Sequence, residues 1–152
     1  MEVVIHCLFS YLSTVTFGLV TNVPRKALNA CGITGTVGWM IYWSTKNLEA
    51  GGIFANFLGA IGIGLLSIYF SRRKKMPMTI FNIPSLVPLV PGGPAYQAVR
   101  SVVLGDYVGG AHFIIKVIMT AGAIAAGFMV TGIAERLLKN ILDKNKPTIK
   151  NQ

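Results

Sequence analysis

The chain has 152 residues, of which 53% are hydrophobic and only 12% are charged. Soluble globular domains carry about 25% charged residues, so this composition excludes a disordered chain, a coiled coil and an ordinary water-soluble enzyme. The net charge is +9, but the basic residues form short clusters between apolar runs. We find no basic stripe interleaved with aromatic residues and no known nucleic-acid-binding motif, so we expect no nucleic-acid partner. The pattern predicts a protein whose main partner is the lipid bilayer.

Five apolar segments approach or exceed the roughly 20 residues needed to cross about 30 Å of hydrocarbon. They predict an all-α integral membrane helical bundle with about five transmembrane helices, the fourth of them broken by prolines. The expected transmembrane domain is residues 1–134, with spans at roughly 3–21, 27–43, 52–70, 79–104 and 106–134. Residues 135–152 form a basic tail, expected to be helical as far as about Leu142.

Small and aromatic residues recur at helical spacing in the first two spans. The first span repeats a small or polar residue every fourth position, at Ser10, Thr14 and Gly18. The second span places glycines three apart, at Gly32, Gly35 and Gly38. Such stripes are typical of helix-packing seams in membranes. The second span closes with an expected aromatic belt at a membrane–water boundary, formed by Trp39, Tyr42 and Trp43.

The fourth segment contains four prolines within eleven residues, at Pro84, Pro88, Pro91 and Pro94. Each proline removes a backbone donor and clashes with the preceding turn, so a continuous helix is not expected. Broken backbone in lipid is tolerated only where it is buried in protein or lines a wet cavity. We expect a half-helix to open at Gly92 and Gly93, with its free N–H groups facing a substrate carboxylate. The alternative is that the prolines produce only a structural kink.

Three ionisable side chains fall within or near the last two spans. Lys116 is expected near mid-membrane, and His112, four residues earlier, should share its face. Arg100 lies inside the predicted half-helix. An ionisable residue in a span costs a few kcal/mol and suggests a function. The structural alternatives are a lysine that snorkels or pairs, an arginine near the outer interface, and a histidine that only packs.

Catalytic chemistry is not evident in this sequence. Neither His6 nor His112 has a second metal ligand at a suitable spacing, and the five acidic residues lie in loops or at span edges. Cys7 and Cys31 lie in apolar stretches and are interpreted as small hydrophobic residues. We therefore expect no enzyme activity, no metal and no cofactor.

The basic clusters predict an orientation. If all five segments cross, the loop with Arg25 and Lys26, the cluster at 72–75 and the basic tail lie on one side. The positive-inside rule then places the amino terminus outside and the carboxyl terminus in the cytoplasm. A re-entrant fourth segment would put the basic tail outside, so five crossings of the cell (inner) membrane are the better account.

The run from Asn82 to Tyr96, followed by Gly105-Asp106-Tyr107, resembles the carboxyl-terminal half of the threonine/serine exporter family in its split-subunit form. The likeness extends over nearly the whole chain. It implies export of threonine and serine, or of dicarboxylates such as succinate. It also implies a second five-span subunit, resembling the amino-terminal half of the family. The motif transfers to Pro84, Pro88, Pro91, Gly92, Asp106 and Tyr107 as site residues.

The sequence thus predicts one subunit of a secondary exporter. Proton coupling would require a titratable group from the partner or from His112. The expected substrate-binding residues are Asn82, Pro84, Ser85, Pro88, Pro91, Gly92, Gly93, Arg100, Asp106, Tyr107, His112 and Lys116. Two rival hypotheses are a scaffold subunit that does not touch substrate, and a homo-oligomeric channel. The channel has weaker support, because no acidic or hydroxyl filter is evident.

Overall fold

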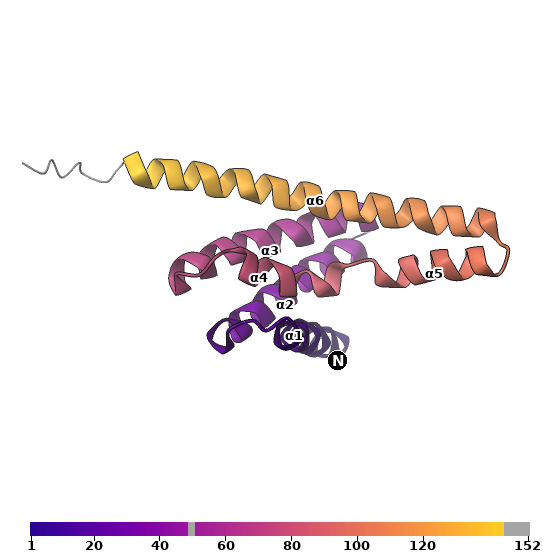
Figure 1. Ribbon diagram of the computed structural model, residues 1–152, viewed down its shortest axis with the longest axis horizontal. Helices are drawn as coiled ribbons and strands as arrows, with labels where there is room; N and C mark the ends of the chain where they lie inside the picture. Colours follow the sequence, from indigo (N-terminus) through magenta and orange to yellow (C-terminus); the bar gives the residue numbers. More distant parts are fainter. Residues whose placement is uncertain (49–50, 145–152) are drawn as a thin grey trace, which may run out of the picture.

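Every regular element in the described part of the chain is helical. The computed structural model describes residues 1–48 and 51–144, with side-chain surroundings up to Lys139. The elements in order are α1 (Glu2–Val20), α2 (Arg25–Asn47), α3 (Gly52–Lys74), α4 (Thr79–Ser85), the 3₁₀-helix η1 (Val87–Leu89), α5 (Gly92–Val103) and α6 (Tyr107–Lys144) (Figure 1). The predicted all-α membrane bundle is confirmed.

Among the described residues, three helices are long and apolar enough to cross a membrane. These are α1, α3 and residues Tyr107–Lys139 of α6. Helix α2 is also long, at 23 residues, but is more polar. It packs against α1, α3 and α4, and a helix shielded by neighbours does not need an apolar surface all round. It begins at Arg25 and ends at Asn47, beyond the expected limits of 27 and 43 at both ends.

The small residues in α1 and α2 form the packing seam that the sequence predicts. Ser10, Thr14 and Gly18 are the buried residues of α1, and Gly32, Gly35 and Gly38 are buried in α2. A methyl group added at Gly35 would lie 2.2 Å from Thr14 Oγ1, and one at Gly38 would lie 2.3 Å from Ile63 Cγ1. Helix α2 approaches α1 at Gly35 and α3 at Gly38 so closely because these positions carry no side chain.

The fourth segment is interrupted, as expected from its prolines. Helix α4 ends at Ser85, η1 follows, and the backbone becomes extended at Val90 (φ −61°, ψ 130°) before α5 starts at Gly92. The half-helix therefore opens at the Gly-Gly pair. Figure 1 shows α4, η1 and α5 as successive pieces of one interrupted pass beside the other helices.

Helices α3 and α6 run parallel in a fixed register. An added Cβ at Gly127 would lie 2.8 Å from Ala60 Cβ, and one at Gly64 would lie 2.3 Å from Thr131 Oγ1. In both pairs the α6 residue lies 67 positions after its α3 neighbour, so residue 119 is level with Gly52, where α3 begins. Helix α6 starts 12 residues earlier, at Tyr107. At 1.5 Å per residue, it extends about 18 Å past the end of α3.

Helix α5 packs antiparallel against this extension of α6. An added Cβ at Gly110 would lie 2.7 Å from the Val102 side chain and 3.5 Å from the Ala98 carbonyl oxygen. We call α5 together with residues 107–118 of α6 the projecting hairpin. Figure 1 shows it extending to the right, past the other helices.

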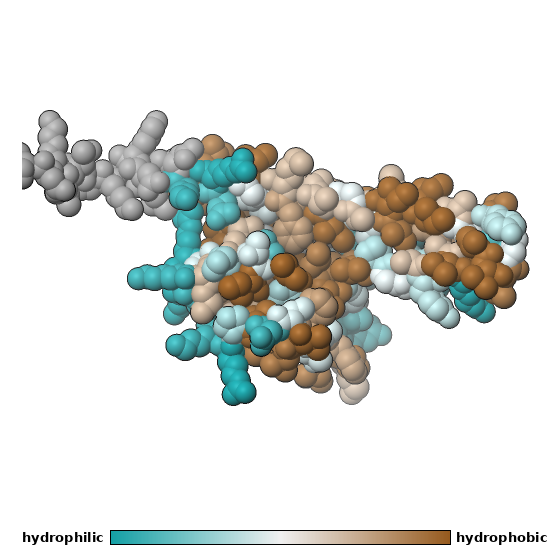
Figure 2. All heavy atoms as spheres, in the orientation of Figure 1, coloured by the Kyte–Doolittle hydropathy of each residue, from teal (hydrophilic) through white to brown (hydrophobic). Residues whose placement is uncertain are grey.

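The basic clusters meet at the opposite end of the molecule. Lys74 Nζ donates a hydrogen bond to the Lys26 carbonyl oxygen, which joins the first two clusters. By the register above, Lys139 of α6 is level with Arg72. Figure 2 shows hydrophilic side chains gathered at this end and apolar ones along the projecting hairpin. The described residues of the three basic clusters therefore share one end, while the orientation of that end in the membrane stays a prediction.

Candidate substrate site at the helix break

A cavity of about 190 Å³ lies at the break between η1 and α5. Its lining comes from α2, α3, the broken segment and α6: Trp39, Tyr42, Asn56, Pro88, Leu89, Val90, Pro91, Pro94 and Thr120. Pockets for drug-sized ligands enclose about 300–1,000 Å³, so this cavity suits a small metabolite. The prolines create it, because they stop the fourth segment from packing as a continuous helix.

The polar groups in this cavity are mainly hydrogen-bond acceptors. Asn56 is 6% exposed and its Nδ2 donates one hydrogen bond to the Gly52 carbonyl oxygen at 2.7 Å, which leaves Oδ1 to accept and the second N–H to donate. Thr120 is 8% exposed and its hydroxyl donates to the Lys116 carbonyl oxygen at 2.8 Å, so its oxygen lone pairs also remain to accept. Tyr42 contributes a phenol that can donate or accept. Two acceptor oxygens, one amide N–H and a phenol suit an ammonium or hydroxyl group better than a carboxylate.

The amino-terminal turn of α5 offers fewer donors than the sequence suggests. Gly92 N donates to the Val90 carbonyl oxygen at 2.8 Å, and Ala95 N donates to the Pro91 carbonyl oxygen at 3.1 Å. Pro94 has no N–H. Among the described residues, Gly93 is therefore the one residue of this turn whose N–H has no backbone acceptor. Pro91 and Pro94 line the cavity, whereas Gly92 and Gly93 are exposed beside it.

Pro84 and Ser85 have structural surroundings away from this cavity. Ser85 Oγ donates to the Cys31 carbonyl oxygen at 3.0 Å, and both Pro84 and Ser85 are fully buried. Pro84 also lines a separate cavity of about 320 Å³ with the turn between α1 and α2. Asn82 is half-buried, and its Oδ1 has no hydrogen-bond partner among the described residues. These residues attach α4 to α1 and α2.

The three ionisable candidates lie on the projecting hairpin. Arg100, His112 and Lys116 are exposed, and none of them lines the cavity at the break. The register places Lys116 three positions before the residue level with Gly52, at the end of the bundle. Lys116 therefore lies at the end of the bundle and not among its packed helices, while its depth in the membrane stays a prediction. His112 and Lys116 do share an exposed face, and the His112 ring packs edge-on against Phe113.

The Gly105-Asp106-Tyr107 motif forms a turn between two helices. Gly105 has φ 84°, and Asp106 N donates to the Ser101 carbonyl oxygen at 2.9 Å, which closes the end of α5 in a Schellman arrangement. Asp106 Oδ1 then accepts from Gly109 N at 2.9 Å and caps the start of α6. Tyr107 is exposed. The structure gives this motif a turn-forming role and does not bring it to the cavity.

Besides Leu89, Val90 and Pro94 of the broken segment itself, sequence reasoning missed the cavity residues from the other helices: Trp39, Tyr42, Asn56 and Thr120. Trp39 and Tyr42 were assigned to an aromatic belt, but both line this cavity, and Trp39 Nε1 donates to His6 Nδ1 at 3.3 Å. Asn56 carried a usable signal, because an amide inside an apolar span is costly to insert and suggests a function. Thr120 carried no such signal in the sequence, since it resembles any other threonine in a span.

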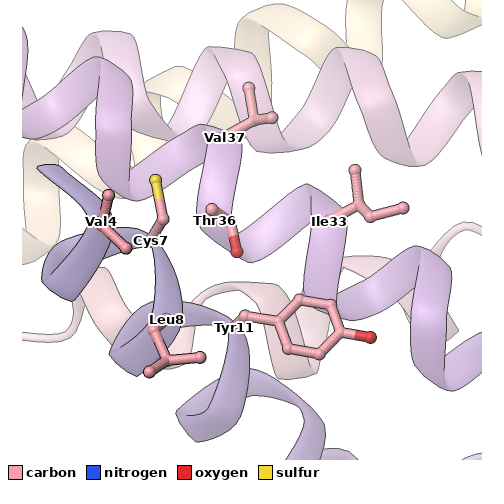
Figure 3. A pocket seen from close by; sticks show the side chains of 7 residues that line it. All are labelled: Val4, Cys7, Leu8, Tyr11, Ile33, Thr36 and Val37. Carbon is pink, nitrogen blue, oxygen red and sulfur yellow. The ribbon is translucent and has the colours of Figure 1, made fainter.

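A larger groove of about 400 Å³ lies between α1 and α2. Figure 3 shows its lining side chains, which project from these two helices: Val4, Cys7, Leu8, Tyr11, Ile33, Thr36 and Val37. The Tyr11 hydroxyl donates to Asn29 Oδ1 at 2.8 Å. Because the remaining lining is almost entirely apolar, this groove suits a hydrocarbon chain better than a polar metabolite.

Comparison with known proteins identifies the family. The family described as "Threonine/Serine exporter, ThrE" matches residues 6–134, which include the cavity and the projecting hairpin. The chain belongs to the threonine/serine exporter family. A Haemophilus influenzae relative described as an uncharacterized protein is 27% identical over 141 residues, covering 88% of this chain and 48% of the relative. The chain therefore spans about half the length of that curated relative, and no solved structure matches it.

Proposed function

We propose that this protein is one subunit of a secondary exporter of small carboxylate-bearing metabolites, working with a second membrane subunit in the cell (inner) membrane. Family membership supports a membrane exporter. The observation that carries the proposal is the cavity at the helix break, to which α2, α3, α6 and the interrupted segment all contribute. Discontinuous helices of this kind form substrate sites in several transporter folds.

The cavity chemistry favours a neutral amino acid over a dicarboxylate. Asn56 Oδ1 and Thr120 Oγ1 are placed to accept from an ammonium or side-chain hydroxyl group. The N–H of Gly93 lies beside the cavity as a donor for one carboxylate oxygen. No described cationic side chain lines the cavity, so a second carboxylate would have no charge partner in this subunit. Threonine or serine is therefore the substrate class we prefer to succinate.

The second subunit supplies what this cavity lacks. A zwitterion needs more carboxylate donors than one backbone N–H, and a proton-coupled exporter needs a titratable acid. The described lining contains no acidic side chain. The chain also spans about half the length of its Haemophilus influenzae relative, which fits a division of one exporter between two chains. The two subunits would complete the site at their interface.

An efflux assay tests this proposal. Cells lacking both subunits are complemented with both genes and loaded with a threonine-containing dipeptide, and intracellular threonine is followed over time. Omitting this subunit should raise threonine retention. Thr120→Val and Asn56→Leu should raise the efflux KM about 3- to 10-fold, the loss expected for one hydrogen bond. Thr16→Val is the matched control, because Thr16 is exposed on α1 and lines none of the described cavities.

The same assay separates the rival functions. If both cavity variants transport normally while deletion removes the second subunit from the membrane, this chain is a scaffold. If the purified chain alone conducts ions in liposomes, it is a channel. Normal threonine retention in cells that lack this chain but contain the partner would contradict the exporter proposal itself.

A further inference from the structure

The projecting hairpin exposes apolar side chains along its whole length. Val108 is 84% exposed, Val103 78%, and Leu104, Tyr96 and Tyr107 each about 70%. Its two helices bury little against each other, with Ala98 and Gly110 as the buried positions. An uncovered apolar surface of this kind is uncommon on a free protein face and usually marks a contact with a partner or with lipid.

Lipid alone does not account for this surface. Helix α1 has 19 residues and is about 28 Å long, close to the roughly 30 Å of hydrocarbon in a bilayer. The bundle ends at the connection between α2 and α3, where Lys46 is exposed. The hairpin extends about 18 Å past that level. The apolar stretch Tyr107–Lys139 of α6 has 33 residues and is therefore about 50 Å long, more than the roughly 30 Å that a single crossing needs.

The hairpin also carries unpaired positive charge. Arg100 and Lys116 are exposed on it, and Asp106, in the turn between its two helices, is already engaged in capping α6. An identical hairpin from a second copy would bring like charges together, which opposes self-association. A surface that is apolar and cationic fits a partner that is apolar and carries carboxylates.

We infer that the projecting hairpin is the docking surface for the second membrane subunit, which packs an apolar helical face against it and places acidic side chains opposite Arg100 and Lys116. This inference rests on the two-subunit exporter proposed above. Support comes from the length of the relative, about twice that of this chain. The second subunit has to pack somewhere, and the other exposed apolar face, that of α1, carries no Lys or Arg side chain to pair with carboxylates.

Site-specific photo-crosslinking tests the surface in the full-length chain. The probe p-benzoylphenylalanine is placed at the position of Val108 on the hairpin or, as a matched control, at that of Leu12 on the exposed face of α1. The chain is co-expressed with the protein of the same genome that resembles the uncovered half of the Haemophilus influenzae relative. We expect a crosslink to that protein from position 108 and none from position 12. Crosslinks only from position 12, only to a second copy, or not at all would overturn the inference.

Charge variants test the acidic chemistry. Lys116→Glu should lower co-purification of the second subunit at least tenfold, whereas Lys116→Arg should preserve it, because only the first reverses the charge. Equal co-purification from both variants would refute the carboxylate pairing. The efflux assay is scored separately: a crosslinked complex that fails to export threonine leaves the docking surface intact and rejects the function. Normal export without any hairpin crosslink rejects the surface and leaves the function intact.

Discussion

The middle and the beginning of α6 lie in very different surroundings. Near its middle, Gly127 packs so closely on α3 that an added methyl group would sit 2.8 Å from the Phe57 carbonyl oxygen. At its beginning, Tyr107 and Val108 are more than 70% exposed. One continuous helix thus belongs to a tightly packed bundle and to a projecting hairpin that has few neighbours. The bundle supplies stability, whereas the hairpin leaves apolar side chains exposed.

Replacing Gly127 should produce the largest loss of stability. Gly127→Ala adds a methyl group against a backbone oxygen that cannot move aside, so we expect a net destabilisation of about 1–3 kcal/mol. Gly122→Ala is the matched control on the same helix, since no atom lies within 4 Å of its added Cβ. Thermal unfolding of the detergent-solubilised protein measures both variants. Equal melting temperatures would show that the contact between α3 and α6 is looser than described.

Removing the Ser85 hydroxyl should have a smaller effect within the bundle. Ser85→Ala deletes the buried hydrogen bond to the Cys31 carbonyl oxygen, which costs about 1 kcal/mol. Ser13→Ala, at an exposed serine of α1, should change the unfolding free energy little. We expect threonine efflux per folded molecule to be normal in both variants. A selective loss of efflux in Ser85→Ala would restore Ser85 as a substrate ligand.

The broken segment, the buried seam and the position of Lys116 show what the sequence could and could not predict. The broken segment follows from its prolines, and the buried seam follows from small residues at Ser10, Thr14 and Gly18, because both signals are local. The position of Lys116 relative to the bundle depends on the register between α3 and α6, which is set by long-range contacts at Gly64 and Gly127. No local pattern encodes that register.

The candidate site was predicted only in part for the same reason. Pro88 and Pro91 line the cavity as expected, because the break that they cause is itself the cavity wall. Arg100 and Lys116 were chosen for their cost in a span, but the hairpin takes both of them away from the bundle. Trp39 and Asn56 come from other helices, and their convergence depends on tertiary packing alone.

A change in the cap of α6 should affect the hairpin without affecting the bundle. Asp106→Ala removes the hydrogen bond to Gly109 N, a loss of about 1 kcal/mol for a helix cap. Asp106→Asn keeps a side-chain oxygen and should retain most of that stability. Amide hydrogen exchange should become faster in the first turns of α6 in the alanine variant only. A lowered melting temperature of the whole protein would show that hairpin and bundle unfold as one unit.

The smallest structural effect is expected at the Gly-Gly pair where α5 begins. No atom lies within 4 Å of a Cβ added at Gly92 or Gly93, and neither residue has a positive φ. Gly93→Ala should therefore change the unfolding free energy by less than about 0.5 kcal/mol, as for other unconstrained surface positions. Its effect on threonine efflux is then informative, because a methyl group there can obstruct only what approaches from outside this chain. A raised efflux KM with unchanged stability would indicate that substrate or the second subunit contacts the Gly93 N–H, whereas unchanged efflux would remove that N–H from the proposed site.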